Sequence, residues 1–445
     1  MKFFDTIKNI WKIEELRNRI LLTLGLLLVY RFGAQVVLPG VDASALDNLS
    51  RQTDGGLLGL LNAFTGGAFS NASVFALGIM PYISASIVVQ LMTIAIPYLQ
   101  KLQKEGDSGR KKITQITRWL TIAITLVQGP GYIYNLYSTL PANAFLLDSS
   151  FTFVASSVII LTTGCIFAMW LGERITDKGI GNGISLLIMV GIIATLPLSF
   201  VQEISSRTSE GNGGLIMILI ELVIWFVIIY ASIMLVRAVR QIPVQYARKS
   251  ASGKFEKQAV GGARQFIPLK LNASGVMPII FAQAIMFIPA AVAGLSDSET
   301  AQGVTAAFQD IFGFWYNLVF GLLIIVFTFF YTAITVPTNK MADDLKRSGG
   351  FIPGIRPGSE TGEYLDRIMS QITLPGSIFL AIIAVFPAVI SLLGVQQGWA
   401  LFFGGTSLLI MVGVAIDTIE QVNSYLLNRH YDGLMKSGKN RKSVA

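Results

Sequence analysis

Long apolar segments alternate with shorter polar ones along the whole chain, and this alternation predicts membrane-spanning helices. Each apolar segment is about 18 to 23 residues long, enough for an α-helix to cross the hydrocarbon core of a bilayer at about 1.5 Å per residue. Ten such segments occur, at 20–38, 74–96, 116–137, 151–171, 183–200, 214–236, 271–293, 314–336, 373–394 and 400–420. The pattern therefore predicts an all-helical polytopic membrane protein with ten transmembrane helices.

Lysine and arginine are confined almost entirely to alternate gaps between these segments. All but four of the 34 Lys and Arg residues lie near the chain ends or in the second, fourth, sixth and eighth gaps; the exceptions are Arg31, Arg51, Arg207 and Arg118, which lies at the edge of the third segment beside the second gap. Because loops on the cytoplasmic side carry an excess of positive charge, these gaps and both termini are predicted to be cytoplasmic. Attraction to anionic lipid explains this charge, and so does a basic docking face for a cytoplasmic partner.

The ten segments divide into two groups of five at the short outer gap near 197–213. With an odd number of helices in each half, the second half (214–420) starts on the opposite side of the membrane from the first (20–200). Two pseudo-symmetric halves would then be inverted relative to each other, with a substrate route at their interface. Residues 1–19 are predicted to form an amphipathic helix along the inner surface, and 421–445 a cytoplasmic tail.

Between the first two apolar segments lies a glycine-rich apolar stretch, 55–70, that is too short to cross a membrane. Irregular backbone at membrane depth is tolerated where it lines a cavity or is buried in protein. One interpretation is a short re-entrant helix over about 57–64, ended by Gly66 and Gly67, within the outer half of a cavity. The other is an interfacial outer loop.

Two of the predicted inner gaps, 237–270 and 337–372, are long, basic and rich in glycine and proline. In the first, apolar and polar residues alternate over 242–246, which predicts a strand, and residues 266–268 predict its return as a hairpin. Long loops in a compact protein are commonly functional, so we expect these two to bind a soluble protein.

The residues needed for enzyme chemistry do not occur in any usable spacing. The sequence has one Cys, Cys165, and one His, His430, and it lacks a P-loop, an HExxH and a GxSxG motif. The charged residues within the apolar segments are Arg31, Glu221, Asp417 and Glu420, together with Arg118 at the edge of its segment, and none of them lies near the middle. A solute transporter is expected to carry such groups near the midplane.

The apolar segments instead supply pairs of isoleucines one helical turn apart. Ile79 and Ile83 form one i,i+4 pair, and Ile184 and Ile188 another, so each pair presents two aliphatic side chains on one helix face. Isoleucine is also ordinary packing or lipid-facing material, so the spacing alone leaves their role open.

Seven stretches, in order and spread over most of the chain, are similar to those of one family. They are 77–87 (LGIMPYISASI), 104–119 (KEGDSGRKKITQITRW), 172–187 (GERITDKGIGNGISLL), 240–249 (RQIPVQYARK), 268–280 (PLKLNASGVMPII), 343–358 (DDLKRSGGFIPGIRPG) and 403–417 (FGGTSLLIMVGVAID). They resemble the SecY family of bacterial protein-conducting channels.

The resemblance implies an hourglass pore between two five-helix halves, closed on the outside by a plug helix and at its waist by a ring of aliphatic side chains. By position within the matching stretches, the ring would consist of Ile79, Ile83, Ile184, Ile188, Ile280 and Ile410. The plug would include Leu57, Leu58, Leu60, Leu61, Asn62 and Phe64. Apolar rings close a narrow pore to ions by dewetting, and they offer a passing polypeptide no hydrogen bonds.

The resemblance also implies a lateral gate and a docking face. The gate would open between the second and third helices on one side and the seventh and eighth on the other, with Asn272 contributing to its polar packing. Docking of a ribosome or of the SecA motor would involve Arg248, Lys249 and Arg356. At 246–249 the order is Tyr-Ala-Arg-Lys where the family has Tyr-Ala-Lys-Arg, which keeps the charge but exchanges two non-equivalent cations.

The function so implied is that of the central pore subunit of a Sec translocase. It would pass unfolded secretory polypeptides across the bacterial inner membrane and release transmembrane segments sideways into lipid, without a cofactor or catalytic site. Its partners would be SecE-like and SecG-like small membrane subunits, SecA or a ribosome, signal peptides, nascent chains and membrane lipid. The alternatives are a secondary solute transporter with inverted repeats and a membrane scaffold that transports nothing.

Overall fold

The computed structural model describes residues 11, 13–46, 56–141, 144–145, 151–209, 214–246, 264–293 and 310–440 of the 445-residue chain. By compactness the chain divides into two units. Unit 1 comprises Met1–Ile218, Gly394–Phe402 and Ile410–Ala445, and unit 2 comprises Leu219–Leu393 and Phe403–Leu409. The first break lies close to the predicted division of the halves, but most of the last predicted span belongs to unit 1.

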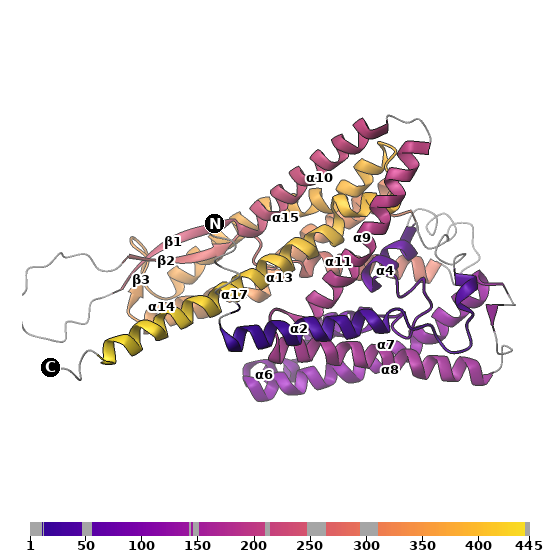
Figure 1. Cartoon of the computed structure of the whole chain (residues 1–445). Coiled ribbons are helices and arrows are strands. Elements are labelled where there is room, and N and C mark those ends of the chain that lie inside the picture. The colour runs from indigo at the N-terminus through magenta and orange to yellow at the C-terminus, as the bar shows by residue number, and fades with distance from the viewer. Residues whose placement is uncertain are drawn as a thin grey trace, which may run out of the picture. The chain divides into compact units, whose positions relative to one another are not determined.

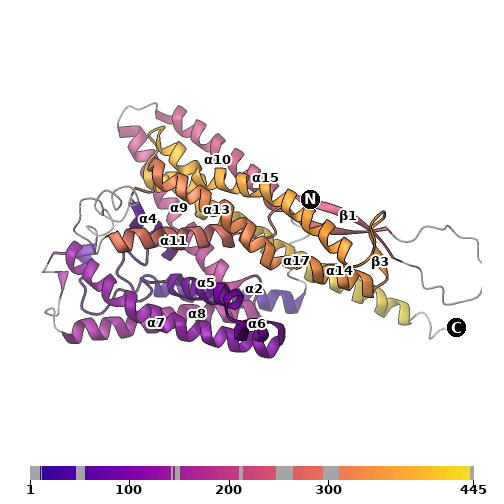
Figure 2. The same cartoon turned by 180° about the vertical axis from the view of Figure 1, so that it is seen from behind.

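Unit 1 is built from helices. They are α2 (Glu14–Gly33), η1 (Ala43–Ala45), α4 (Gly56–Thr65), α5 (Met80–Ala95), α6 (Pro97–Lys104), α7 (Asp107–Thr139), α8 (Phe151–Lys178), α9 (Gly183–Ser209), α16 (Gln397–Ala400) and the larger part of α17 (Gly405–Asn440). Helices α7 and α8 run side by side, and α5 packs on α7 (Figure 1, Figure 2). At one end of α7 and α8 a cluster of buried residues, including Tyr132, Leu136 and Phe153, joins them to the segment that follows α4.

Unit 2 combines long helices with a small sheet. Its elements are α10 (Gly214–Arg237, from Leu219 onward), β1 (Val239–Tyr246), β2 (Arg264–Lys270), α11 (Met277–Ala293), α13 (Phe314–Thr335), α14 (Thr338–Arg347), β3 (Gly350–Phe351), α15 (Ser359–Ser391) and part of η3 (Leu401–Phe403). Helix α13 packs against both α11 and α15 (Figure 2).

A helix lies over each of the ten predicted membrane segments, which confirms the predicted all-helical polytopic membrane fold. Within the described part of the chain, six helices are long and apolar enough to cross a membrane, or seven if α5 and α6, bent by 104° at Ile96, form one broken span. The described apolar part of α11 is shorter, Met277–Met286. In lipid every backbone amide must be bonded internally, and a helix satisfies this within one segment.

Several helices extend well beyond their predicted apolar spans. Helix α7 begins at Asp107 rather than near 116, and α15 begins at Ser359 rather than near 373. Each starts directly after a glycine with positive φ, Gly106 at 75° and Gly358 at 119°. Hydropathy marks the part of a helix that lies in lipid, whereas the helix itself continues to the residue that breaks it.

The predicted hairpin is present and gains a third strand. Strands β1 and β2 are antiparallel with Ile242 opposite Ile267, and β3 pairs with the end of β1 through Tyr246 and Gly350, giving the order β2-β1-β3. We call β1, β2, β3, α14 and the first turns of α15 the sheet module. Its core consists of Ile242, Val244, Leu269, Leu345, Ile352, Leu365 and Met369. No strand was predicted in the second loop, because β3 is two residues long and gains its hydrogen bonds from β1.

The two ends of the chain agree only partly with the predicted boundaries. Of the predicted surface helix over 1–19, residues 1–10 and 12 lie outside the described residues, and α2 already begins at Glu14. The predicted tail over 421–445 is helical through Asn440 as a continuation of α17.

Candidate functional site

The glycine-rich stretch of unit 1 contains a short helix, α4, that covers the predicted plug. It has ten residues, too few to cross a bilayer. Leu60 and Phe64 are buried, at 5% and 8% exposed, and Leu61 and Asn62 are partly buried. Leu57 and Leu58 are in the helix, but their side chains lie outside the described set. The re-entrant interpretation, with a helix folded into protein, therefore fits better than an exposed interfacial loop.

Two glycines end α4, as the sequence predicts. The amide of Gly66 donates to the carbonyl of Ala63 at 3.2 Å, and that of Gly67 donates to Asn62 at 2.9 Å. This is the Schellman arrangement, and it requires the positive φ of 66° found at Gly66. The turn is reinforced by the Asn62 side chain, which accepts a hydrogen bond from the amide of Ser70 at 3.1 Å.

The end of α4 is packed against two other helices of unit 1. On α9, a Cβ built at Gly191 would lie 2.8 Å from the carbonyl oxygen of Phe64, so the two backbones are nearly in contact. From α2, Arg31 Nη1 donates to the carbonyl oxygen of Gly66 at 2.8 Å. The sequence marked Arg31 as an unusual charge within an apolar segment but offered no partner for it.

The first pair of predicted ring residues lies where α5 begins. Ile79 directly precedes the helix and is 4% exposed, and the amide of Ile83 donates to its carbonyl at 3.0 Å. Ile83 is partly buried one turn further on. Gly78 has a φ of 54°, and this turn sets the direction in which α5 leaves the segment after α4.

The second pair lies on the first turns of α9, after a tight turn that joins α8 to α9. The amide of Ile180 donates to Thr23 Oγ1 of α2 at 3.1 Å, and that of Gly181 donates to Gln421 Oε1 of α17 at 2.9 Å. Ile184 is partly buried and Ile188 is 5% exposed. Two helices distant in sequence therefore fix the point from which both isoleucines project.

The remaining two ring residues lie in different units. Ile410 is on α17 in unit 1 and is 1% exposed, whereas Ile280 is on α11 in unit 2 and is partly buried. Five of the six isoleucines thus belong to unit 1. The closed ring of six stays a prediction.

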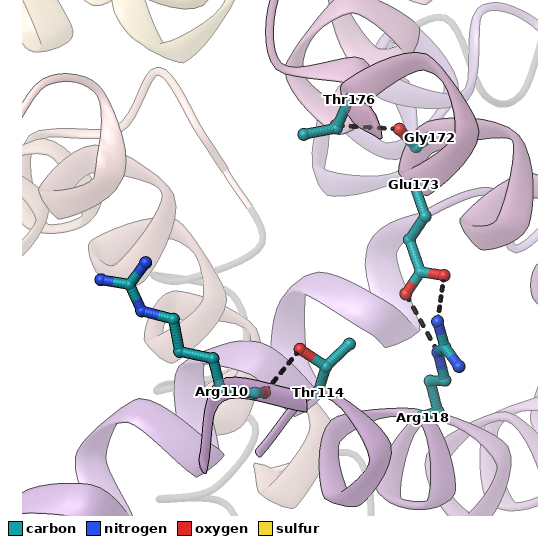
Figure 3. A network of polar contacts seen from close by, with 6 residues as sticks. All are labelled: Arg110, Thr114, Arg118, Gly172, Glu173 and Thr176. Atoms are coloured by element: carbon teal, nitrogen blue, oxygen red, sulfur yellow. Dashed lines mark hydrogen bonds and ion pairs between the residues drawn. The ribbon is translucent and has the colours of Figure 1, made fainter. Parts of the chain in front are cut away.

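A polar network joins α7 to α8 near the predicted inner ends of these helices (Figure 3). Arg118 donates from Nε and Nη2 to the two carboxylate oxygens of Glu173, at 3.1 and 2.5 Å. The guanidinium of Arg110 points away from this pair, while its backbone carbonyl accepts a hydrogen bond from Thr114. Sequence reasoning missed the ion pair because its partners are 55 residues apart.

The predicted gate residue Asn272 belongs to unit 2. It is 7% exposed and lies in the turn before α11, and it accepts a hydrogen bond from Ser274 Oγ at 3.3 Å. Its partner is thus a neighbour in the same turn, and its role in a gate stays a prediction.

Of the predicted docking residues, the structure describes Arg356, which lies beside the sheet module. Arg356 is 87% exposed on the loop between β3 and α15, with Nη1 3.7 Å from Glu360 Oε1. Its backbone carbonyl accepts a hydrogen bond from Thr361 Oγ1 at 2.8 Å, which fixes the loop while the guanidinium stays available. Arg248 and Lys249, beyond the end of β1, lie outside the described residues.

Among the residues that the structure describes, no three His, Cys, Asp or Glu side chains are grouped so that they could hold a metal ion. Glu221, the acidic residue of α10, is 5% exposed and so faces the interior of its own chain. At the predicted ring and plug positions the residues are apolar except Asn62, and the polar contacts described above position helices.

Comparison with known proteins agrees with this arrangement. A family model, SecY, matches residues 73–419. Protein translocase subunit SecY of Streptomyces scabiei is 42% identical over 439 residues, covering 96% of this chain and 98% of the relative. The protein of the same name from Halalkalibacterium halodurans is 40% identical, covering 97% of this chain and all of the relative.

Solved structures with the same fold include a protein-conducting channel, at a TM-score of 0.60, 17% identity and 91% coverage of both chains. Another is Sec61 in the canine ribosome-channel complex from the endoplasmic reticulum, at a TM-score of 0.55, 16% identity and 91% coverage of both chains. At this identity these likenesses concern the fold alone. The family model and the full-length relatives at about 40% identity go further: the chain belongs to the SecY family.

Proposed function

We propose that this chain is the pore-forming subunit of a protein translocase, a membrane channel that conducts unfolded polypeptides and has no catalytic site of its own. Its membership of the SecY family and the names of its relatives support this function. The structural observation that carries it is α4, an apolar helix too short to span a membrane and seated inside unit 1 by Arg31 and Gly191. Such an element is suited to filling a cavity.

In this proposal the six isoleucines form the narrow part of the pore. Aliphatic side chains hold no ion and no ordered water, so a narrow ring of them empties of water and blocks ions at rest. They also offer no hydrogen bond to a passing chain, so any sequence slides through without being retained. The short helix α4 closes the pore on the predicted outer side.

Hydrophobic segments would leave the pore sideways, between α5 and α7 on one side and α11 and α13 on the other. A central Lys, Arg or Asp opposes insertion by about 2.5 to 3.5 kcal/mol, whereas Leu, Ile, Phe and Val each favour it. An apolar stretch of about 20 residues would therefore partition into lipid while a polar one continues across. Asn272 would contribute to the closed packing of this exit.

The proposed setting is the bacterial inner membrane with both termini in the cytoplasm, as the distribution of Lys and Arg indicates. SecE-like and SecG-like subunits would accompany the chain in the membrane. The sheet module would then face the cytoplasm and dock a ribosome or the SecA motor through Arg248, Lys249 and Arg356. On ribosomal RNA these cations would contact phosphates and give a salt-dependent affinity.

Deletion of 57–64 is the direct test of the plug. We expect the shortened protein to assemble and to leak ions at rest, because the cavity that α4 fills would hold water. The measurement is the resting ion conductance of the purified complex in a planar bilayer. A conductance equal to that of the full-length protein would show that α4 does not seal the channel.

Replacing Arg356 with Glu tests the docking face. Arg356 is 87% exposed, so the charge reversal is expected to leave folding unchanged and to reduce motor-driven export at least tenfold. Export of a secretory precursor into membrane vesicles is the measurement. Lys101→Glu, the same reversal at an exposed position on α6, is the matched control and should export normally. Normal export by Arg356→Glu would remove this residue from the docking surface.

A further inference from the structure

Arg31 is the cation that contacts the re-entrant helix. It lies in the last turn of α2, partly buried, and its Nη1 donates to the carbonyl oxygen of Gly66 at 2.8 Å. The two residues are 35 positions apart, so the bond joins two separate elements of unit 1. A hydrogen bond from a charged donor is about twice as strong as one between neutral groups, and more so where water is scarce.

The end of α4 is well suited to receive a positive charge. The carbonyl groups at the C-terminus of a helix carry a partial negative charge, and cations there are stabilising. The amides of Gly66 and Gly67 are used to close the helix on Ala63 and Asn62. The Gly66 carbonyl lies just beyond this closure, and Arg31 binds it at the negative end of the helix.

Gly66 is required at this position for two independent reasons. Its φ of 66° is one that residues with a Cβ rarely adopt. In addition, a Cβ at Gly66 would lie 2.5 Å from Arg31 Nη1 and 2.7 Å from Gly191 Cα, closer than nonbonded atoms approach. The absence of a side chain therefore lets the carbonyl of Gly66 reach the guanidinium while α9 passes directly behind it.

We propose that Arg31 is a positioning residue that holds the plug in its closed place, an inference that rests on the sealing role proposed for α4. While α4 is seated, the partial negative charge at its C-terminal end stabilises the partly buried guanidinium. When α4 leaves, Arg31 loses this partner and must be hydrated. A dry, resting pore therefore favours the seated helix, whereas a pore opened and wetted by a translocating chain favours release.

The test compares resting ion conductance in planar bilayers for the purified complex carrying Arg31→Met, Arg31→Lys or neither. Methionine keeps much of the apolar length and removes the cation, and we expect about a tenfold rise in conductance, the effect of losing one charge-assisted hydrogen bond. Lysine keeps a charge and a donor and should restore most of the closed state. Arg19→Met, which removes another arginine of α2, one paired with exposed Glu15, should leave the conductance unchanged.

Combination with the 57–64 deletion separates this proposal from the plug function itself. If the deletion alone leaves the conductance unchanged, α4 does not seal the channel, and both proposals are overturned. If the deletion raises the conductance while Arg31→Met does not, only the proposal that Arg31 holds α4 in place is overturned. The proposal for Arg31 is also overturned if Arg31→Met raises the conductance of the deletion variant as much as it raises that of the full-length protein. The substitution would then loosen the protein in general.

Amide hydrogen exchange provides a second readout, sensitive to local opening rather than to global unfolding. In Arg31→Met we expect faster exchange at 60–67, with α7 and α8 unchanged. Uniformly faster exchange over unit 1 would contradict a specific role of Arg31 in positioning α4.

Discussion

Replacing Glu203 with alanine is expected to destabilise the protein by about 3–5 kcal/mol, the usual result of breaking a buried ion pair by removing one partner. Glu203 and Arg207 are one turn apart on α9, with Arg207 Nε 2.8 Å from Glu203 Oε1 and side-chain exposures of 1% and 7%. Once the carboxylate is gone, the guanidinium keeps its charge in a site that water scarcely reaches. Loss of the carboxylate that balances this buried cation is the main source of the expected destabilisation.

The carboxylate of Glu203 also fixes a second segment of unit 1. Its Oε2 accepts a hydrogen bond from the amide of Gln396 at 2.9 Å, so the segment before α16 is tied to α9. Trp399 of α16 adds a second contact with α9, since the centroids of its ring and the Phe200 ring are 5.0 Å apart. Glu203→Ala is therefore expected to loosen the 394–402 segment before the rest of unit 1 unfolds.

The measurement is the apparent melting temperature of the detergent-purified complex, with hydrogen exchange over 394–402 as the local readout. Glu15→Ala is the matched control, because Glu15 pairs with Arg19 in the same i,i+4 spacing but at 61% and 29% exposure. An exposed pair contributes about 0–1 kcal/mol, so this variant should melt almost as the original protein does. Equal melting temperatures for the two variants would contradict the argument.

A Gly183→Ala substitution is expected to lower stability by about 3 kcal/mol, at the upper end of the range for inserted atoms in packed sites. The added Cβ would lie 1.9 Å from the carbonyl oxygen of Gly172 and 2.7 Å from Ile175 Cβ. The first of these is backbone of α8, which has no rotamer by which to move aside. Helices α8 and α9 would have to separate at the turn that also positions Ile184 and Ile188.

Thermal unfolding of Gly183→Ala beside Gly131→Ala tests this prediction. Gly131 lies within α7, and apart from its chain neighbours and the backbone of its own helix no atom lies within 4 Å of a built Cβ, so alanine there is expected to stabilise the helix by about 0.5–1 kcal/mol. Opposite shifts of the two variants would confirm that close approach, rather than glycine itself, sets the requirement. A Gly183→Ala protein that melts like the original would show that α8 and α9 can separate without loss.

Much of the fold could be predicted because its strongest signals are local. The membrane helices follow from the lengths of the apolar segments, and the hairpin follows from alternation over 242–246. The end of α4 at Gly66 and Gly67 was also readable, since a helix closed in this way needs a residue that tolerates positive φ. In contrast, α14 and β3 were not predicted. The two residues of β3 form a strand only through pairing with Gln245 and Tyr246.

The candidate site was also predicted only in part. The positions of the six isoleucines came from similarity to a family, and spacing alone left them indistinguishable from ordinary packing residues. The contacts that fix elements in place were not predicted: Arg31 with Gly66, Glu203 with the amide of Gln396, and Arg118 with Glu173. Each joins residues between 35 and 193 positions apart, and nothing in either segment specifies the other.

The sequence by itself determined that the chain crosses a membrane repeatedly, which gaps are basic, and where a short apolar stretch interrupts the pattern. These properties depend on the transfer of each segment between water and lipid and on the backbone preferences of single residues, so they can be read segment by segment. Only the tertiary structure decided which charges are paired and which glycines are indispensable. Both depend on the distance between atoms of different helices, and that distance exists only once the helices have packed.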